Sequence, residues 1–433
     1  MNAPTAPPTH PPRRRAEVAA WALYDTANSA FFLIVVTAFF PFFFRDTLLG
    51  GDVARGDALW GAMLSASAVL VALSSPVMGA LAEARRWRKA LLAAYTLVAV
   101  CGTALLGFGS ALSLPLAVVA FVLANAATEG GMVFYGALLP SVASRERLGR
   151  VSGLGWAVGY LGSVVALIFA HVVLGGPTGA TMFFVAAWFA LFALPLFVLV
   201  EDRTPPRGTR ESALAGLRAA LRDAWRTRDL RRFLVAFFLY NDGVTTTIAF
   251  AALFAKDELG FPQALLVGLI VGIQVTGAIG AALLGGVADR RGNVFAIGGT
   301  LVLWLAVTLA AFGLSLDLAL WEGREQVRQL AFLGVGLAVG FGLGAVQSQS
   351  RALLVGMVPE SRTAEFMGLY AVCGRASAIV GPAVFGALAA FTGSKSASVL
   401  FLAALFAGGL VLLRGVDEQR GRRELLARSE ATG

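Results

Sequence analysis

Apolar segments long enough to cross a membrane recur along the whole chain and alternate with short polar stretches. A helix needs about twenty consecutive apolar residues to span the hydrocarbon core of a bilayer. The pattern therefore predicts an all-α membrane protein with twelve transmembrane helices. We expect them at Val18–Phe44, Leu59–Ala82, Ala90–Gly109, Leu114–Leu139, Val151–Leu174, Thr181–Val200, Phe233–Phe254, Ala264–Ala288, Phe295–Ser315, Val327–Met357, Phe366–Phe391 and Ser396–Leu413.

The longest internal polar segment, residues 201–232, divides these helices into six and six. We expect an N-terminal bundle at 18–200 and a C-terminal bundle at 233–414, joined by this segment as a cytoplasmic linker. Residues 211–226 of the linker place leucines and a tryptophan on one face and arginines on another. This pattern predicts an amphipathic helix on the membrane surface, which serves as a tether, as a regulatory element or as both.

The two bundles also repeat one another in sequence. Four residues of the first half align at one constant offset with four of the second: Pro140, Glu146, Gly149 and Gly162 with Pro359, Glu365, Gly368 and Gly381. Both halves begin on the same side of the membrane, so the repeat is parallel. Two six-helix bundles related by an axis along the membrane normal are expected from such a repeat.

The charge distribution orients the predicted helices. Charged residues make up only 14% of the chain and hydrophobic residues 58%, yet the net charge is +9. The Lys and Arg residues collect in alternate loops and in the two tails, which is the positive-inside pattern. We therefore expect residues 1–17, which are Pro-rich and disordered, and residues 415–433 to be cytoplasmic tails. Basic loops beside anionic headgroups require no nucleic-acid partner.

The chain has few residues suited to metal binding or nucleophilic catalysis. It contains two cysteines, Cys101 and Cys373, and two histidines, His10 and His171. This set is too small for a metal centre and makes a structural disulfide or a Ser-His-Asp triad within the membrane an unfavourable interpretation. No strand–glycine loop–helix context for nucleotide binding is present. We therefore expect no enzyme and no cofactor.

Ionisable side chains nevertheless fall within five predicted helices, the first, fourth, seventh, tenth and eleventh. They are Asp25, Glu129, Asp242, Arg351 and Arg375. A charge in the membrane is costly, so such residues normally face a cavity or a partner and mark a pathway. Polar residues on the same helices are candidates to line that pathway: Asn28, Asn125, Asn241 and Gln347.

The three acids are candidates for proton coupling. A proton-coupled carrier needs a group that takes up and releases a proton as access alternates, and burial and neighbouring charges compete to set that balance. Glu129 and Asp242 are our first candidates, with Asp25 close behind. Asp25 lies nearer the cytoplasmic end of its helix and is equally placed to act in a gate. The alternative for each acid is a permanent ion pair or a helix–helix hydrogen bond.

The two arginines suggest different roles. Arg375, near the middle of its helix, either clamps an anionic group of the substrate or neutralises Asp242 or Glu129. Arg351 lies closer to the cytoplasmic end, where a gating or structural role is favoured. The stretch 241–243, Asn-Asp-Gly, is poor at holding a helix interior and predicts a local break. An intact helix with a tight contact at the glycine is the alternative.

Several motifs resemble one transporter superfamily. GGVADRRGN, which contains Asp289 and Arg290, resembles the G-x-x-x-D-R-x-G loop of the major facilitator superfamily, between the second and third helices of a half. The first-half copy, GALAEARRWRK, is degenerate: Glu83 replaces the aspartate and the following glycine is missing. WALYDTANSAF, GRVSGLGWAVGYLG, FLYNDGVTTTIAF and AEFMGLY resemble, more specifically, the "unknown major facilitator" branch, which includes the autophagy-related vacuolar effluxers.

The resemblance implies a function. It implies the major facilitator fold and a secondary transporter that works by alternating access around a site near the bilayer midplane. It also implies that Glu83, Asp289 and Arg290 form a cytoplasmic latch. Amino acids are the favoured substrates, H⁺ the favoured coupling ion and export the favoured direction. A lipid or drug carrier of the same fold, or a receptor or scaffold that no longer transports, are the alternatives.

The resemblance and the composition together suggest a setting. We expect a monomer in a lipid bilayer with a small-molecule substrate. The Ala-, Gly- and Arg-rich composition is typical of a GC-rich bacterial genome, which favours a bacterial inner membrane with both termini in the cytoplasm.

Overall fold

The long helices arise from the apolar segments and form two consecutive sets. The computed structural model describes residues 15–204, 212–257, 261, 263–316, 323–392 and 395–430, and these residues contain helices but no strand. The first half comprises α1 (Arg15–Ala30) with its π-helical continuation η1 (Phe31–Ala38), α3 (Val53–Arg85), α4 (Arg88–Leu106), α5 (Leu114–Ala137), α7 (Leu148–Val172) and α8 (Gly179–Leu199). The second comprises α10 (Arg228–Asp257), α11 (Gln263–Arg291), α12 (Asn293–Ser315), α13 (Glu325–Met357), α14 (Thr363–Thr392) and α15 (Lys395–Leu413).

Most of these helices are both long and apolar. Ten of them, within the described part of the chain, are long and apolar enough to cross a membrane. The pair of α15 and α16 (Glu418–Glu430), bent by 64° at their junction, gives an eleventh. The remaining long helix, α10, packs beside α14 and α15 in the same bundle. The all-α membrane fold expected from the hydropathy pattern is confirmed.

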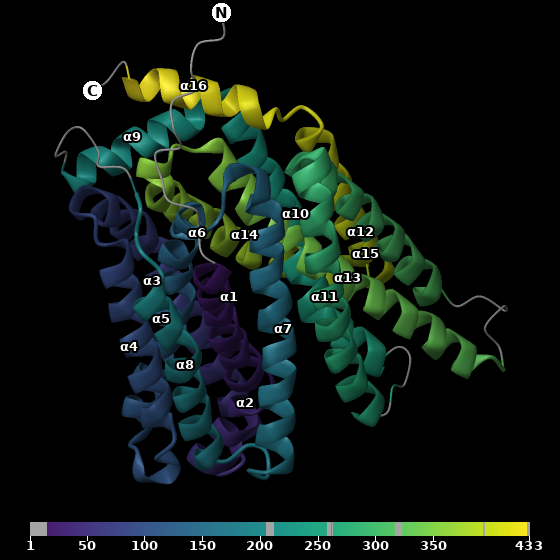
Figure 1. Cartoon of the computed structure of the whole chain (residues 1–433). Helices are drawn as coiled ribbons and strands as arrows, with labels where there is room; N and C mark the ends of the chain where they lie inside the picture. Colours follow the sequence, from purple (N-terminus) through teal and green to yellow (C-terminus); the bar gives the residue numbers. More distant parts are fainter. Residues whose placement is uncertain are drawn as a thin grey trace, which may run out of the picture.

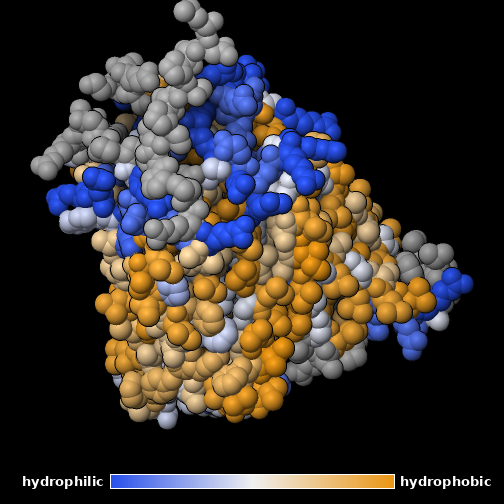
Figure 2. Space-filling model, in the orientation of Figure 1, coloured by the Kyte–Doolittle hydropathy of each residue, from blue (hydrophilic) through white to orange (hydrophobic). Residues whose placement is uncertain are grey.

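Two amphipathic or polar helices lie across one end of the bundle, α9 (Ala213–Arg226) and α16 (Figure 1). We call this end the α9/α16 face. The two halves lie close together there and diverge toward the opposite end (Figure 1). Hydrophilic residues gather at the α9/α16 face, whereas the sides of the long helices are predominantly hydrophobic (Figure 2).

Small residues bring the halves into contact near the α9/α16 face. A side chain at Gly153 of α7 would collide with the carbonyl oxygen of Ala281 on α11, and one at Gly79 of α3 would collide with that of Ala364 on α14. Such close backbone approach is typical of small residues between membrane helices. Farther from this face, Gly381 of α14 packs instead against Asp242 of its own half. The halves are therefore packed closely at the α9/α16 face and diverge toward the other end (Figure 1).

The predicted break in the seventh long helix is wrong. Helix α10 continues through Asn241–Gly243. The hydroxyls of Thr245 and Thr247 donate to the carbonyls of Asn241 and Gly243, at 3.0 and 2.7 Å. A side chain at Gly243 would meet the Phe406 ring at 2.9 Å. The glycine thus provides a tight helix–helix contact, which was the alternative.

The predicted amphipathic linker helix is present as α9. The Ser212 hydroxyl accepts the Ala215 backbone N–H at 3.3 Å and caps the helix N-terminus. Gly216, Ala220 and Ala224 are buried against the bundle, and the apolar residues beside this packed face remain exposed: Leu214, Leu221 and Trp225. An exposed apolar stripe next to a packed one suits the membrane interface.

The chain ends differ in detail from the expected tails. Helix α1 begins at Arg15, and its buried Glu17 forms an ion pair with Arg203 of the linker at 2.8 Å. Residues 1–14 and 431–433 lie outside the described residues. The C-terminal tail forms α16, which the sequence pattern did not lead us to expect.

Helix α16 is anchored by the Asp229 carboxylate at the start of α10. The Arg420 guanidinium donates two hydrogen bonds to this carboxylate, each at 2.6 Å, and the Asp417 backbone N–H donates a third at 3.0 Å. Burial alone would raise the pKa of Asp229, but these donors outweigh it and hold the pKa below its usual value. A lowered native pKa stabilises the contact above the unfolded-state pKa, and this contribution is lost as the pH falls.

We therefore expect the anchoring of α16 to weaken below a pH of about 4 and to be lost as the pH falls through the lower native pKa of Asp229. Hydrogen exchange of α16 amides at pH 7 and at a series of pH values below 4, corrected for the intrinsic rate, measures this. Asp229→Asn should reproduce the acid behaviour at pH 7. Asp52→Asn, which alters an exposed carboxylate capping α3 at the other end of the bundle, should leave α16 unchanged. Equal protection of α16 in both variants at pH 7 would contradict the anchoring role.

Candidate functional site

Arg351 of α13 crosses from the second half to the first. Its Nε donates to the Ser152 hydroxyl at 2.9 Å, and its terminal nitrogen donates to the Ser152 carbonyl at 3.0 Å and to the Asp25 carboxylate at 3.4 Å. Both partners in the ion pair are buried, with side chains 4% and 3% exposed. Asp25 and Arg351, predicted separately, are therefore one inter-half contact.

Three aromatic rings enclose this contact. The Arg351 guanidinium lies 4.9, 5.1 and 5.9 Å from the ring centres of Trp21, Tyr135 and Trp156. The Tyr135 hydroxyl also donates to Asp25 at 2.8 Å. A guanidinium is weakly hydrated and stacks favourably on aromatic faces, which suits it to such a buried position. This contact holds α13 of the second half against α1 and α7 of the first half, near the α9/α16 face. A gating or structural role for Arg351 was the prediction.

A second ion pair connects the halves nearer the middle of the helices. Arg375 of α14 donates to Glu129 of α5 at 2.8 Å. Unlike the first pair it is partly accessible, because the Arg375 side chain is 35% exposed and that of Glu129 is 9% exposed. Of the two acids that Arg375 was expected to neutralise, its partner is Glu129. The Glu129 Oε2 atom has no hydrogen-bond partner among the described residues.

Polar side chains of the second half cluster on the helices around Arg375. Gln347 of α13 donates to the Asn241 amide oxygen at 3.0 Å, and Asn241 of α10 donates to the Ser377 hydroxyl at 2.7 Å. Ser377 lies half a turn beyond Arg375 on α14. The predicted pathway residues Asn241 and Gln347 are thus brought together, and Ser377 joins them.

The other predicted pathway residues lie outside this cluster. Asp242 is buried, and the backbone N–H of Gly381 on α14 interacts with its carboxylate. The buried amides of Asn28 and Asn125 have unpartnered oxygens within the described part of the chain. Asn125 lies one turn before Glu129 on α5, whereas Asn28 lies one turn after Asp25 on α1. Unsatisfied buried polar atoms are costly and often mark a site for water or a ligand.

The residues predicted to form a cytoplasmic latch, Glu83, Asp289 and Arg290, lie in separate places, and the two acids form separate contacts between the halves. Glu83 at the end of α3 pairs with Arg88 at 2.5 Å and accepts the Ala364 backbone N–H, at the start of α14, at 2.6 Å. Asp289 at the end of α11 accepts the Arg150 backbone N–H, near the start of α7, at 3.1 Å. Arg290 is exposed.

The two acids nevertheless play equivalent parts. Each carboxylate ends the second long helix of its half and binds the N-terminal turn of a helix in the other half, where backbone N–H groups and the helix dipole favour negative charge. The two contacts therefore involve equivalent helices of the repeated halves, and both hold the halves together at the α9/α16 face.

Some residues of these contacts were not predicted. Arg88 lies in the basic run ARRWRK, where nothing distinguishes it from its neighbours, and Tyr135 lies in an apolar stretch. A signal existed for Trp21, Ser152 and Trp156, which belong to the motifs WALYDTANSAF and GRVSGLGWAVGYLG. Within the described residues, no group of three or more His, Cys, Asp and Glu residues could hold a metal ion.

Comparison with known proteins places the chain among transporters. The family model described as "Vacuole effluxer Atg22 like" matches residues 57–426. The "Uncharacterized MFS-type transporter YxiO" of Bacillus subtilis (strain 168) is 27% identical over 417 residues, which cover 92% of this chain and 94% of that protein. Autophagy-related protein 22-1 of Neosartorya fischeri is 29% identical over 307 residues, which cover 64% of this chain and 49% of that protein.

Solved structures share the fold. The human organic anion transporter MFSD10 (TETRAN) superimposes with a TM-score of 0.73 at 17% identity, over 93% of this chain and 100% of that chain. A bacterial homologue of the iron transporter ferroportin, in an outward-facing state, has a TM-score of 0.70 at 15% identity, over 92% and 98% of the two chains. At these identities the likeness concerns the fold alone.

Proposed function

The chain belongs to the vacuole effluxer Atg22-like family, a branch of the major facilitator superfamily, and from that premise we propose that it carries amino acids as zwitterions. It is an integral multi-pass membrane protein and a transporter, not an enzyme. The observation that carries the substrate proposal is the partly exposed ion pair between Glu129 and Arg375, one residue from each half.

This ion pair matches the charges of an amino acid. A zwitterion that enters between the halves offers its carboxylate to Arg375 and its ammonium group to Glu129. The Glu129–Arg375 ion pair is then replaced by two ion pairs with the substrate. No charged group of the protein or of the substrate is left unpaired in the membrane. A guanidinium also suits a carboxylate geometrically, because its N–H groups bind both oxygens at once.

Neighbouring amides support the same proposal. Asn241 and Gln347 already bind one another at 3.0 Å, and their remaining donor and acceptor positions serve a polar side chain or backbone group of the substrate. A separate apolar cavity lies within the second half and is lined by residues such as Leu269, Phe332 and Phe385. Its volume of about 80 Å³ is too small for a lipid chain or a drug-sized molecule, so this cavity does not favour that alternative.

Alternating access requires the contacts at the α9/α16 face to separate. The Asp25–Arg351 ion pair and the hydrogen bonds of the Glu83 and Asp289 carboxylates hold the halves together there. Substrate bound between Glu129 of α5 and Arg375 of α14 changes the attraction between the halves at a second level, nearer the middle of the helices. In this proposal the two levels open in turn as the halves rock about the central site.

We propose Asp242 as the proton carrier. Among the described residues no Lys or Arg forms an ion pair with it, whereas Asp25 and Glu129 each have a guanidinium partner. An unpaired carboxylate is costly to bury, so this position accommodates the neutral, protonated form.

The setting follows from charge and composition. The arginine-rich α9/α16 face is proposed to be cytoplasmic by the positive-inside rule, in a bacterial inner membrane. The end at which the halves diverge then faces outward, and export from the cytoplasm is the proposed direction. The protein works as a monomer in the bilayer, with H⁺ as coupling ion, without a cofactor or a nucleic-acid partner.

Purified protein in liposomes tests this proposal. We expect uptake of a subset of labelled amino acids and acceleration of that uptake by a pH gradient. Decarboxylated and N-acetylated forms of the best substrate serve as matched controls and should not be transported, because each lacks one charge of the zwitterion. Transport of these forms as fast as the parent would refute the zwitterion proposal, and gradient-independent uptake would refute proton coupling.

A further inference from the structure

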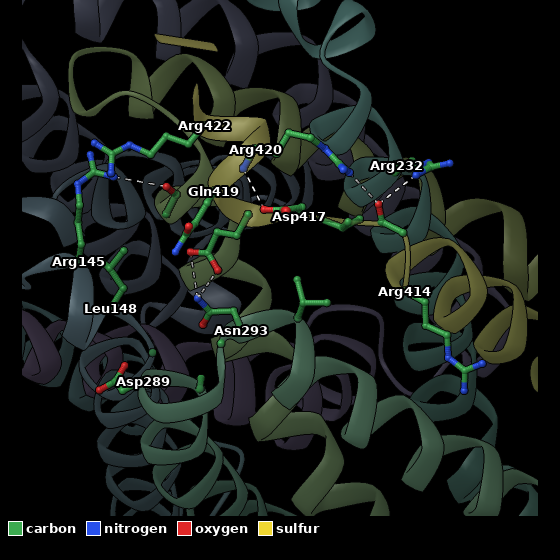
Figure 3. A pocket seen from close by; sticks show the side chains of 18 of the residues that line it. Arg145, Leu148, Arg232, Asp289, Asn293, Arg414, Asp417, Gln419, Arg420 and Arg422 are labelled. Atoms are coloured by element: carbon green, nitrogen blue, oxygen red, sulfur yellow. Dashed lines mark hydrogen bonds between the residues drawn. The ribbon is translucent and has the colours of Figure 1, made fainter. Parts of the chain in front are cut away.

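A large cavity opens on the α9/α16 face, apart from the central ion pair. Its volume is about 1030 Å³, and it lies between the start of α7, the α11–α12 turn, the end of α13 and the C-terminal segment with α16 (Figure 3). Six arginines line it: Arg145, Arg228, Arg232, Arg414, Arg420 and Arg422. Four acids also line it: Glu146, Asp289, Asp417 and Glu418. The lining thus has an excess of positive charge.

Several of these acids already have partners within the protein. Asp289 accepts the Arg150 backbone N–H at 3.1 Å, and Asp417 accepts the Arg420 backbone N–H at 2.9 Å. Glu418 accepts the Asn293 amide at 3.3 and 3.4 Å, and burial raises the pKa of its carboxyl. Glu418 also attracts Arg145 and Arg422, so these two guanidiniums are partly neutralised within the protein.

Two of the arginines converge within the cavity. Figure 3 shows the Arg145 and Arg422 side chains extending from opposite sides to the same end of the cavity. Burial and repulsion from Arg145 lower the pKa of Arg422 and outweigh the attraction of Glu360 and Glu418. The Arg422 Nε is buried and has no acceptor among the described residues. Arg145 donates to the partly exposed Glu360 carboxylate at 3.3 Å and to the Gly356 carbonyl at 3.5 Å. Two close guanidiniums with an unused buried donor form an arrangement that an anion would stabilise.

We propose that this cavity binds a phosphate-bearing anion between Arg145 and Arg422 and that the bound anion holds the α9/α16 face closed. A phosphate presents several oxygens to two guanidiniums at once and neutralises their repulsion. Both an anionic phospholipid headgroup and a soluble phosphate compound carry such a phosphate group. The cavity volume admits either.

The closing effect follows from the position of the two arginines. Arg145 lies on the first half, in the turn before α7, whereas Arg422 lies on α16, which Asp229 and Arg420 anchor to the second half. An anion between them is a bridge across the halves, beside the Asp289 contact that already joins them. A ligand that binds one conformation better must shift the equilibrium toward it, so the bound anion favours the closed face.

Binding can be measured by thermal unfolding of the purified full chain. One arm adds inorganic phosphate or glycerol 3-phosphate in detergent, with sodium chloride at equal ionic strength as control. The other compares nanodiscs of phosphatidylcholine with nanodiscs that also contain phosphatidylglycerol. Arg422→Gln removes one side of the bridge, and Arg423→Gln, an exposed neighbour on the same helix that does not line the cavity, is the matched control.

Closure can be measured separately by cysteine labelling. Ser75 is buried between α3 and α14 near this face, so Ser75→Cys, with the native Cys101 and Cys373 replaced by serine, reacts with a soluble maleimide only when the face opens. We expect the anion to slow labelling about fivefold in the Arg423→Gln background and to have no effect in the Arg422→Gln background. This readout does not depend on which substrate is transported.

The outcomes are distinct. A response to soluble phosphate assigns the cavity to a metabolite, and a response only to phosphatidylglycerol assigns it to a lipid headgroup; either supports the proposal if Arg422→Gln abolishes it. The proposal is overturned if neither anion stabilises the protein beyond chloride, if Arg422→Gln and Arg423→Gln respond alike, or if binding leaves the labelling rate unchanged.

Discussion

Substituting Arg375 with glutamine is expected to lower amino-acid uptake about a hundredfold, which corresponds to the loss of one charge-assisted contact worth about 2.7 kcal/mol. In the wild type the guanidinium is bound to Glu129 at 2.8 Å and is 35% exposed, so it is both charged and reachable by a substrate. Glutamine keeps a polar side chain of similar length but cannot neutralise a carboxylate. Initial rates of uptake into liposomes at several substrate concentrations measure the effect.

Three further variants separate transport from folding. Glu129→Gln alone should also abolish uptake, because it removes the partner of the substrate ammonium group. The double variant Glu129→Gln with Arg375→Gln leaves no unpaired charge, so we expect it to unfold at the wild-type temperature and still fail to transport. Arg375→Lys keeps the charge without the planar fork and should recover only part of the rate. Normal uptake by the double variant would show that the pair has a structural role only.

Substituting Arg351 with methionine is expected to destabilise the folded protein by about 3–5 kcal/mol, because it leaves the Asp25 carboxylate buried without its cation. The Asp25 side chain is only 3% exposed, and Tyr135 would remain its one described donor. Methionine keeps the apolar length of arginine, so contacts with the surrounding rings are largely retained. Thermal unfolding in detergent, followed by tryptophan fluorescence, measures the loss.

The reciprocal variant is needed to assign this effect to the pair. Asp25→Asn combined with Arg351→Met removes both charges, and we expect it to recover most of the stability lost in Arg351→Met. Its α9/α16 face should nevertheless open more often, because the halves have lost a shared ion pair. This is read from faster labelling of Ser75→Cys. If the double variant is no more stable than Arg351→Met, the loss comes from packing around the rings and not from the unpaired carboxylate.

The candidate site illustrates why pairing could not be predicted. Asp25, Glu129, Arg351 and Arg375 were recognised individually, because a charge within an apolar segment is costly wherever the segment packs. Their partners lie 326 and 246 residues away in the chain. Only the packing of one half on the other brings these residues together. The Arg290 side chain, adjacent to Asp289 in the motif, points away into solvent because successive helix positions face different directions.

The hydropathy pattern, the repeat and the polar positions by themselves determined that this chain forms a helical membrane transporter of two similar halves, because the bilayer requires long apolar helices and penalises isolated charges. The same reasoning located the amphipathic α9. It could not decide whether α10 is broken, since helix continuity depends on the tight contact of Gly243 with Phe406 and on threonine hydroxyls.

The tertiary structure alone decided which charges meet, which end of the protein is closed and that α16 folds. These outcomes depend on long-range contacts, such as Asp229 with Arg420 and Asp25 with Arg351, whose energies exist only after the helices have packed. A local pattern records the cost of placing one side chain in the membrane. The partner that offsets this cost is chosen by the geometry of the whole bundle.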